Sequence, residues 1–273
     1  MLVNFVIIGA QKSATTLLAD QFRRHPEVSF CHRKEPHYFS RESNWAENID
    51  DYHGLYTQRP GHIYGEASTT YSRFPLYPHV PSALRDYNPG LKLIYVVRDP
   101  IERMKSAYMH SYAKGRVRIK IDEALLERSF FLNVSRYGVQ IRWYLEQFPP
   151  EQLLLLTFEE VIGDAAVTWE KLSHYLGIAN PDISTLNCGA KNATTDFQWT
   201  PHFRGKKALN RIIRKIPGLR RVRPPAFFVS EWSSRPELTL ETQQALWRLL
   251  EEDVRFVEEY LGQEMSHWRE RYT

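Results

Sequence analysis

Short, unbroken apolar runs recur along the chain, and most of them lead through a polar turn into a segment with helical spacing. Continuous apolar runs bounded by turn residues are typical of strands buried on both faces of a sheet. The pattern predicts strands at residues 5–8, 28–30, 91–97 and 153–157.

Apolar residues at helical spacing fill much of the chain between these runs. Leu17, Leu18 and Phe22 mark the first such segment, which stops before Pro26. The spacing predicts helices at residues 15–24, 82–87, 101–114, 119–128, 135–148, 165–176 and 240–261. Repeated alternation of strand and helix implies a mainly parallel sheet. We therefore expect an α/β fold, a single P-loop-like three-layer domain over residues 1–273 with helices flanking a central sheet.

The composition suits a packed globular chain. Of its 273 residues, 42% are hydrophobic and 13% aromatic, which argues against disorder. The formal net charge of +4 permits an anionic ligand but does not by itself indicate nucleic acid, which we do not expect as a partner. Cys31 and Cys188 are the only cysteines, so we expect no disulfide framework and no sulfur-based zinc site.

The first residues enter a strand without the basic and apolar regions of a signal peptide, and no apolar run approaches the length of a membrane span. These features predict a cytoplasmic protein.

The turn after the first predicted strand has the character of an anion site. A loop that enters a helix N-terminus presents unpaired backbone N–H groups along a favourable dipole. Here the loop follows Gly9, Lys12 adds a positive charge, and small residues allow close approach: Ser13, Ala14, Thr15 and Thr16. A plain βα turn with a solvated lysine is the alternative. Lys12 precedes the turn, unlike the lysine of a nucleoside-triphosphate loop.

A second chemical segment, Lys34-Glu35-Pro36-His37-Tyr38-Phe39, follows the second predicted strand. The Glu35 carboxylate is a candidate general base, because partial burial among aromatic rings is expected to raise its pKa. His37 is the rival base. The alternative is that Lys34 and Glu35 are ordinary surface charges.

A third segment, Arg98-Asp99-Pro100, closes the strand predicted at 91–97, and Ser106 lies eight residues beyond Arg98 in the next helix. Open α/β sheets bind ligands at the carboxyl ends of their strands, where a guanidinium can hold a phosphate with two hydrogen bonds. Asp99 suits the helix N-cap and Pro100 its first turn. The alternative places Arg98 in a local salt bridge with Asp99 and Ser106 on a solvated face.

Taken together and in this order, the three segments resemble the motifs of sulfotransferases that use 3′-phosphoadenylyl sulfate (PAPS), in particular the heparan sulfate type and bacterial sulfotransferase domains. The resemblance implies that Glu35 is the base and that Gln11 to Thr16 bind the 5′-phosphosulfate, with Lys12 also catalytic. It implies that Arg98 and Ser106 bind the 3′-phosphate that distinguishes PAPS from ATP.

Two weaker matches extend this resemblance. The Tyr137-Gly138 turn is similar to one near the nucleotide in the family, although core packing explains Tyr137 equally well. Arg204, Gly205 and Lys206 are similar to the element that closes over PAPS. They lie in a basic stretch at about 191–230, whose roles remain open: a lid or acceptor-facing insertion, a peripheral membrane contact through 204–223, or a solvated helix.

One stretch departs from the family. Residues 65–71 resemble its Gly-Glu-Lys-[ST]-Pro-x-Tyr sequence, but Ala67 replaces the lysine of glycosaminoglycan-modifying members and Thr69 replaces the proline. The departure favours a small or less anionic acceptor. The aromatic residues Trp45, Tyr52 and Tyr56 either line the acceptor pocket or pack, and packing is favoured.

The resemblance implies in-line transfer of a sulfuryl group from PAPS, with PAP as product, to a hydroxyl or amine of a small-molecule, glycolipid or saccharide acceptor. This scheme requires no metal. The alternatives are a P-loop kinase that uses ATP and Mg²⁺, which the position of Lys12 disfavours, and a nucleotide- or membrane-binding protein that has lost catalysis. The sequence leaves oligomeric state open.

Overall fold

The structure is a computed structural model that describes residues 1–186 and 236–273. The predicted closing element at 204–206 and the basic stretch at 191–230 lie outside these residues, so their roles stay predictions. Among the described helices, none is long and apolar enough to cross a membrane.

Five parallel strands form the central sheet, in the order β2-β3-β1-β4-β5. They are β1 (Phe5–Gly9), β2 (Val28–Phe30), β3 (Ile63–Ala67), β4 (Lys92–Val97) and β5 (Leu153–Thr157). The pattern predicts four of them closely. It misses β3, whose short apolar start is interrupted by Gly65 and Glu66, because a buried carboxyl inside a strand breaks the apolar signal.

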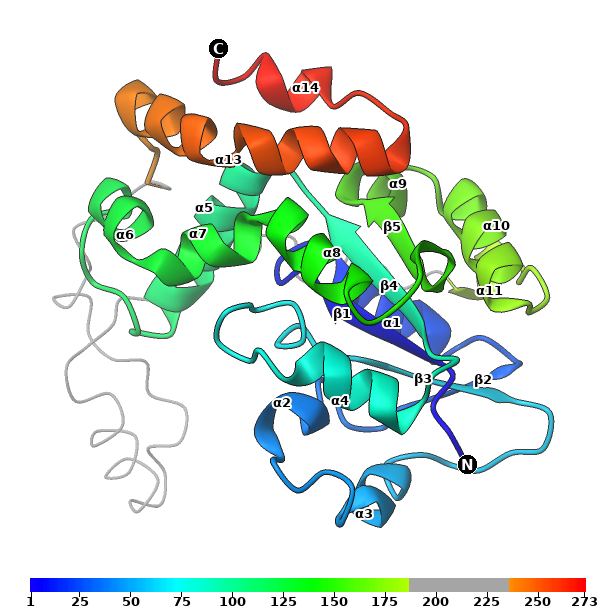
Figure 1. Ribbon diagram of the computed structural model, residues 1–273. Coiled ribbons are helices and arrows are strands. Elements are labelled where there is room, and N and C mark those ends of the chain that lie inside the picture. The colour runs from blue at the N-terminus through cyan, green and yellow to red at the C-terminus, as the bar shows by residue number, and fades with distance from the viewer. Residues whose placement is uncertain (187–235) are drawn as a thin grey trace, which may run out of the picture.

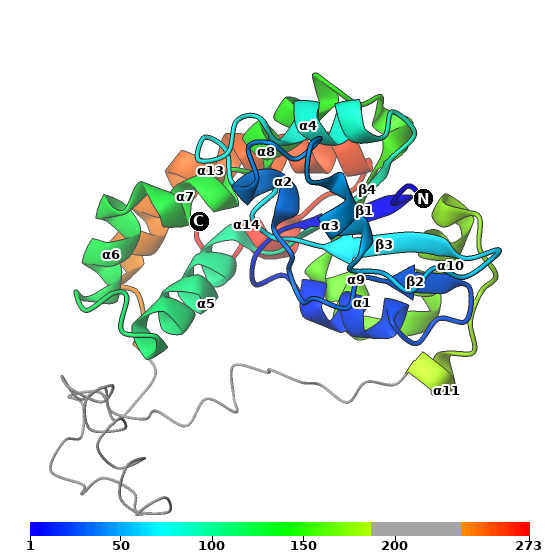
Figure 2. The same cartoon turned by 90° about the horizontal axis from the view of Figure 1, so that it is seen from below.

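Alternate strand residues supply the two cores of a three-layer fold. Phe5 and Ile7 of β1 pack with α1 (Thr15–Phe22), α9 (Phe158–Gly163) and α10 (Ala165–Leu176) on one face. Val6 and Ile8 pack into the larger core on the other face, beside α4 (Val80–Tyr87), α8 (Tyr137–Leu145) and α13 (Leu240–Leu261). Figures 1 and 2 show the two helical layers on opposite faces of the sheet. The predicted α/β class and central parallel sheet are confirmed.

The remaining helices surround this frame. They are α2 (Tyr38–Arg41), α3 (Ile49–His53), α5 (Pro100–Ala113), α6 (Ile121–Glu127), α7 (Ser129–Ser135), the 3₁₀ turn η1 (Pro150–Gln152), α11 (Ile183–Leu186) and α14 (Ser266–Arg269). The helix predicted at 135–148 begins at Tyr137 instead, because Arg136 has a non-helical backbone that separates α7 from α8. The short α2, α3 and α7 were not predicted, since helices this brief carry little periodic signal.

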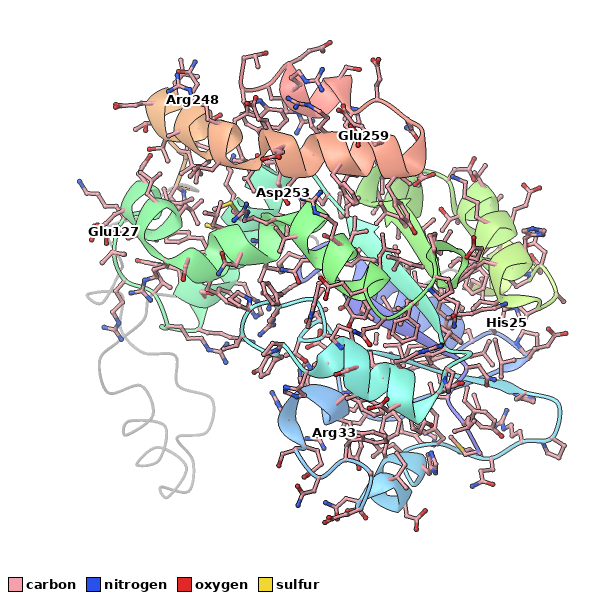
Figure 3. All side chains as sticks on the ribbon, in the orientation of Figure 1. His25, Arg33, Glu127, Arg248, Asp253 and Glu259 are labelled. Carbon is pink, nitrogen blue, oxygen red and sulfur yellow. The ribbon has the colours of Figure 1, made fainter. Side chains whose placement is uncertain are left out.

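A buried carboxylate joins α13 to the start of α8 (Figure 3). Asp253 is 2% exposed, accepts a hydrogen bond from the Val139 backbone N–H at 3.0 Å, and pairs with Arg136 at 3.1 Å. A Cβ at Gly138 would lie 2.9 Å from the Asp253 carboxylate and 3.2 Å from its Cα. Only glycine therefore allows the two helices to approach this closely.

We expect Gly138→Ala to lower the free energy of unfolding by about 1–3 kcal/mol, because the added methyl forces α13 away from α8. Gly163→Ala is the matched control, since a Cβ there meets nothing within 4 Å. Urea unfolding should show no loss for the control, and equal losses in both variants would contradict this account.

Candidate active site

The loop between β1 and α1 offers backbone donors at the carboxyl edge of the sheet. Lys12 and Ala14 adopt left-handed backbone conformations, with φ of 75° and 62°. Among the described residues, no acceptor is provided for the N–H groups of Ala14, Thr15 and Thr16. Free donors at a helix N-terminus attract an anion. The strained backbone is consistent with a functional loop.

Several buried hydroxyls lack hydrogen-bond partners in the described part of the chain, and two of them belong to predicted ligand residues. Ser13 Oγ and Ser106 Oγ have no hydrogen bond, although the two residues are 0% and 1% exposed. A buried hydroxyl without a partner is unusual, because desolvation then goes uncompensated. Both sites therefore fit a ligand with acceptor oxygens such as a phosphate.

Arg98 stands at the end of β4 and reaches back to the β1 loop. Its Nη1 donates to the Lys12 carbonyl oxygen at 3.2 Å, and its guanidinium lies 4.3 Å from the centre of the Phe158 ring. It has no carboxylate partner within the described residues. The alternative of a salt bridge with Asp99 is wrong, and the guanidinium retains donors for a ligand.

Asp99 has other partners. It is 1% exposed and caps α5 by accepting hydrogen bonds from the Ile101 and Glu102 N–H groups, as the sequence predicts. The Tyr272 hydroxyl also donates to it, at 2.8 Å, and Arg271 pairs with it at 3.2 Å. The end of the described chain therefore supports the residue next to Arg98.

Lys12 lies in an electropositive environment. Burial, followed by the charge of Arg98, lowers the pKa of its ammonium group from the ordinary lysine value. Lys34 and Lys114 add to this effect. A concentration of positive charge that folding does not neutralise is suited to an anionic ligand.

Glu35 and His37 form one hydrogen-bonded unit opposite this loop. His37 Nε2 lies 3.3 Å from Glu35 Oε2, and the Thr69 hydroxyl donates to Glu35 Oε1 at 3.2 Å. His37 Nδ1 lies 2.8 Å from the Thr70 hydroxyl. Both Glu35 and His37 have left-handed backbones, with φ of 50° and 57°. The segment is held in a conformation that free chains seldom adopt.

The expected direction of the Glu35 pKa is wrong. Burial does oppose ionisation, but hydrogen bonds from His37 and Thr69 and the nearby Arg73 charge outweigh it and hold the pKa below its usual range. Glu35 is consequently a carboxylate at neutral pH. It can accept a proton without first losing one.

A small cavity brings the loop and the carboxylate together. Thr15, Thr16 and Glu35 contribute to its wall, and the rest of the lining comes from Ala19, Arg23, Lys34 and Ala67. Ala67 occupies the position of the family's lysine, so its methyl leaves room at this wall. The cavity joins the predicted phosphosulfate site to the predicted base.

The other predicted residues are less directly placed. Gln11 is half-buried in the loop, whereas Tyr137 is fully buried against Tyr95 in the core, so its role as a cofactor contact stays a prediction. Tyr52 and Tyr56 pack as expected. Arg204, Gly205 and Lys206 lie outside the described residues. No group of three or more potential metal ligands occurs within residues 1–186 and 236–273.

The sequence pattern does not reveal Glu66 and the hydroxyls around it as part of the site. The Gly65-Glu66 match to the family contains Glu66, but the pattern gives it no role. Thr69, read only as a departure from the family's proline, proves to be a hydrogen-bond donor to Glu35. The pairing of Thr69 with Glu35 joins residues 34 positions apart and becomes visible only once the chain is folded.

Comparison with known proteins agrees with this geometry. A family profile described as "Sulfotransferase domain" matches residues 3–193. Heparan sulfate glucosamine 3-O-sulfotransferase 3A1 of Mus musculus is 27% identical over 186 residues, which cover 63% of this chain and 45% of that protein. Carbohydrate sulfotransferase 15 of Mus musculus is 26% identical over 246 residues, covering 65% of this chain and 44% of that protein. The chain spans less than half the length of these curated relatives.

A solved structure supports the fold. The crystal structure of a sulfotransferase from Alicyclobacillus acidocaldarius superimposes with a TM-score of 0.70 at 23% identity, over 98% of this chain and 99% of that one. The family profile matches well over half of the sequence. The chain therefore belongs to the PAPS-dependent sulfotransferase family.

Proposed function

We propose that this protein transfers a sulfuryl group from PAPS to a hydroxyl or amine of its acceptor, with Glu35 as the general base. One observation carries the proposal: Thr15 and Thr16 of the anion-binding loop and the Glu35 carboxylate line the same cavity. An acceptor in this cavity would lie between the group that takes its proton and the loop that holds the donor.

Each residue has a role that follows from its surroundings. Bound PAPS would supply the sulfuryl group and PAP as leaving group. Lys12 would neutralise negative charge at the reacting oxygens, and the loop N–H groups and Ser13 would hold the 5′-phosphate. Arg98 and Ser106 would hold the 3′-phosphate. Positioning and charge stabilisation dominate transfers of this kind.

The proposed acceptor is a small molecule, a glycolipid or a saccharide. The names of two relatives, a heparan sulfate glucosamine sulfotransferase and a carbohydrate sulfotransferase, support a saccharide. Ala67 in place of the family's lysine supports a less anionic one.

Calorimetric titration tests the cofactor. Wild-type protein should bind PAP and show no comparable affinity for ATP with Mg²⁺. Arg98→Ala should weaken PAP binding about 10- to 100-fold, because one charge-assisted contact is worth roughly 1.5–3 kcal/mol. Binding of adenosine 5′-phosphate, which lacks the 3′-phosphate, should change far less in the same variant.

Arg142→Ala is a suitable control, since Arg142 stacks on Phe256 at 4.3 Å, away from the loop. It should bind PAP like the wild type. A preference for ATP with Mg²⁺ would favour the kinase alternative. Equal PAP affinities of the wild type and Arg98→Ala would contradict the assigned 3′-phosphate site.

A further inference from the structure

Glu66 is a buried carboxyl that the mechanism above does not use. It lies near the end of β3 and is 0% exposed. Its Oε1 accepts hydrogen bonds from Tyr52 at 2.9 Å and Tyr71 at 2.8 Å, and its Oε2 accepts one from Ser68 at 2.6 Å. Burial of a carboxyl carries a desolvation cost, which the three hydroxyl hydrogen bonds offset in part.

Two of these three hydroxyls continue to the backbone that carries the base. Ser68 Oγ accepts a hydrogen bond from the His37 N–H at 2.9 Å, and Tyr71 Oη accepts one from the Phe39 N–H at 3.2 Å. Each hydroxyl donates to Glu66 and accepts from the first turn of α2. The Tyr52 hydroxyl instead accepts from Tyr56.

The network explains how an unfavourable backbone is kept. His37 has φ of 57° and forms the N-cap of α2 without any capping hydrogen bond from its own side chain. The N–H groups of this first turn therefore need outside acceptors. The Ser68 and Tyr71 hydroxyls are these acceptors, and each of them donates its own hydrogen to the Glu66 carboxyl.

We propose that Glu66 is a positioning residue, which fixes the backbone of residues 35–39 through the Ser68 and Tyr71 hydroxyls and thereby aims Glu35 and His37 at the cavity. This proposal rests on the proposed function, in which Glu35 is the base. Glu66 makes no hydrogen bond to Glu35 or His37 and is not among the residues that line the cavity; the two hydroxyls are its hydrogen-bonded connection to the α2 backbone.

The carboxylate form suits this role. An ionised Glu66 accepts all three hydroxyl hydrogens, whereas a protonated one forces a hydroxyl to turn its hydrogen away. Burial raises the pKa of Glu66 to about 7, against the opposing effect of its hydrogen bonds. The titratable groups that face it are Cys31, Glu35, Tyr52, Tyr56, Tyr71, Tyr87 and Tyr144.

Stability and activity should therefore respond to pH in opposite directions. Since the folded pKa is raised, the protonated carboxyl is the form that folding favours: its contribution to stability is present below the ordinary glutamate pKa and is lost as pH rises through about 7. Correct aim of the base requires the ionised form, so kcat should rise severalfold over the same interval. Glu66→Gln, which cannot ionise, should flatten the pH dependence of both stability and kcat. A residue with a purely structural role would not make stability and kcat change in opposite directions with pH.

Paired tyrosine variants give the sharpest test. Tyr71→Phe and Tyr52→Phe each remove one hydrogen bond to the same carboxylate oxygen, but only Tyr71 reaches the backbone of α2. Tyr71→Phe and Ser68→Ala should each lower kcat about tenfold with the KM for PAPS changed less than twofold, the loss expected for one hydrogen bond. Tyr52→Phe should leave kcat within about twofold.

Amide hydrogen exchange provides a readout that needs no turnover. Exchange at the His37 N–H should accelerate about tenfold in Ser68→Ala, and exchange at Phe39 should do so in Tyr71→Phe, while Tyr52→Phe affects neither. Equal effects of the two tyrosine variants on exchange and kcat would overturn the proposal. If the wild type bound no PAP and transferred no sulfuryl group, the proposed function would fail, and faster exchange at His37 and Phe39 in Glu66→Gln would still decide whether Glu66 holds the backbone.

Discussion

Glu35→Gln should lower kcat for sulfuryl transfer by about 10²- to 10⁴-fold, the range that a positioned general base contributes. The carboxamide has nearly the shape of the carboxylate and can still accept from Thr69, but it cannot take a proton at neutral pH. We therefore expect PAP affinity within about twofold of the wild type. Transfer of labelled sulfuryl from PAPS to the best of a panel of oligosaccharides, glycolipids and simple alcohols measures the rate.

His37→Asn separates the two candidate bases. If Glu35 is the base, this variant loses the hydrogen bond to the Glu35 carboxylate and its rate should fall less than that of Glu35→Gln. A larger loss of rate in His37→Asn than in Glu35→Gln would identify the His37 imidazole as the general base. In the pH dependence of kcat, the loss of rate caused by protonation of Glu35 should occur below the ordinary glutamate range. Its hydrogen bonds and the charge of Arg73 lower the pKa of Glu35 despite burial.

Lys12→Met should lower kcat by about 10²- to 10³-fold, comparable to the loss of a donor that stabilises developing charge. Methionine keeps the length of the side chain and removes only the ammonium. Stabilisation that grows as the leaving group departs is reflected in kcat more than in ground-state affinity. PAP titration should therefore show a smaller loss, about tenfold.

Lys114→Met distinguishes a specific contact from a general positive field. Lys114 is exposed at the end of α5 and lies within electrostatic reach of Lys12. Its removal should change kcat less than about threefold and the effect should shrink in salt. Similar losses of kcat in both lysine variants would mean that Lys12 acts only as one of several charges in a general positive field.

The fold was predictable because local patterns determine most of it. The apolar runs of β1, β4 and β5 and the long periodic α13 are strong signals, and each lies close to its predicted bounds. The strand β3 was missed, since Glu66 interrupts its apolar sequence. One of the hydroxyl partners of Glu66, that of Tyr52, lies on α3, and local pattern cannot anticipate such a pairing.

The site was predictable only in part. Arg98 stands directly after β4, and Lys12 and Glu35 follow β1 and β2 by a few residues. Sequence order therefore brings all three to the carboxyl edge of the parallel sheet, where ligands bind. Their electrostatics depend on partners that sequence spacing does not reveal. His37, with Thr69 and Arg73, reverses the expected shift of the Glu35 pKa, and Arg98 packs on Phe158 rather than pairing with Asp99.

The bond between Tyr272 and Asp99 has a consequence for synthesis of the protein. The two residues are 173 positions apart in the sequence, and the Tyr272 hydroxyl satisfies a carboxylate adjacent to the proposed 3′-phosphate ligand. All five strands precede residue 158 and are therefore synthesised long before Tyr272. Asp99 acquires its full set of partners only after residue 272 has left the exit tunnel, so the surroundings of Arg98 are completed long after the strands have been made.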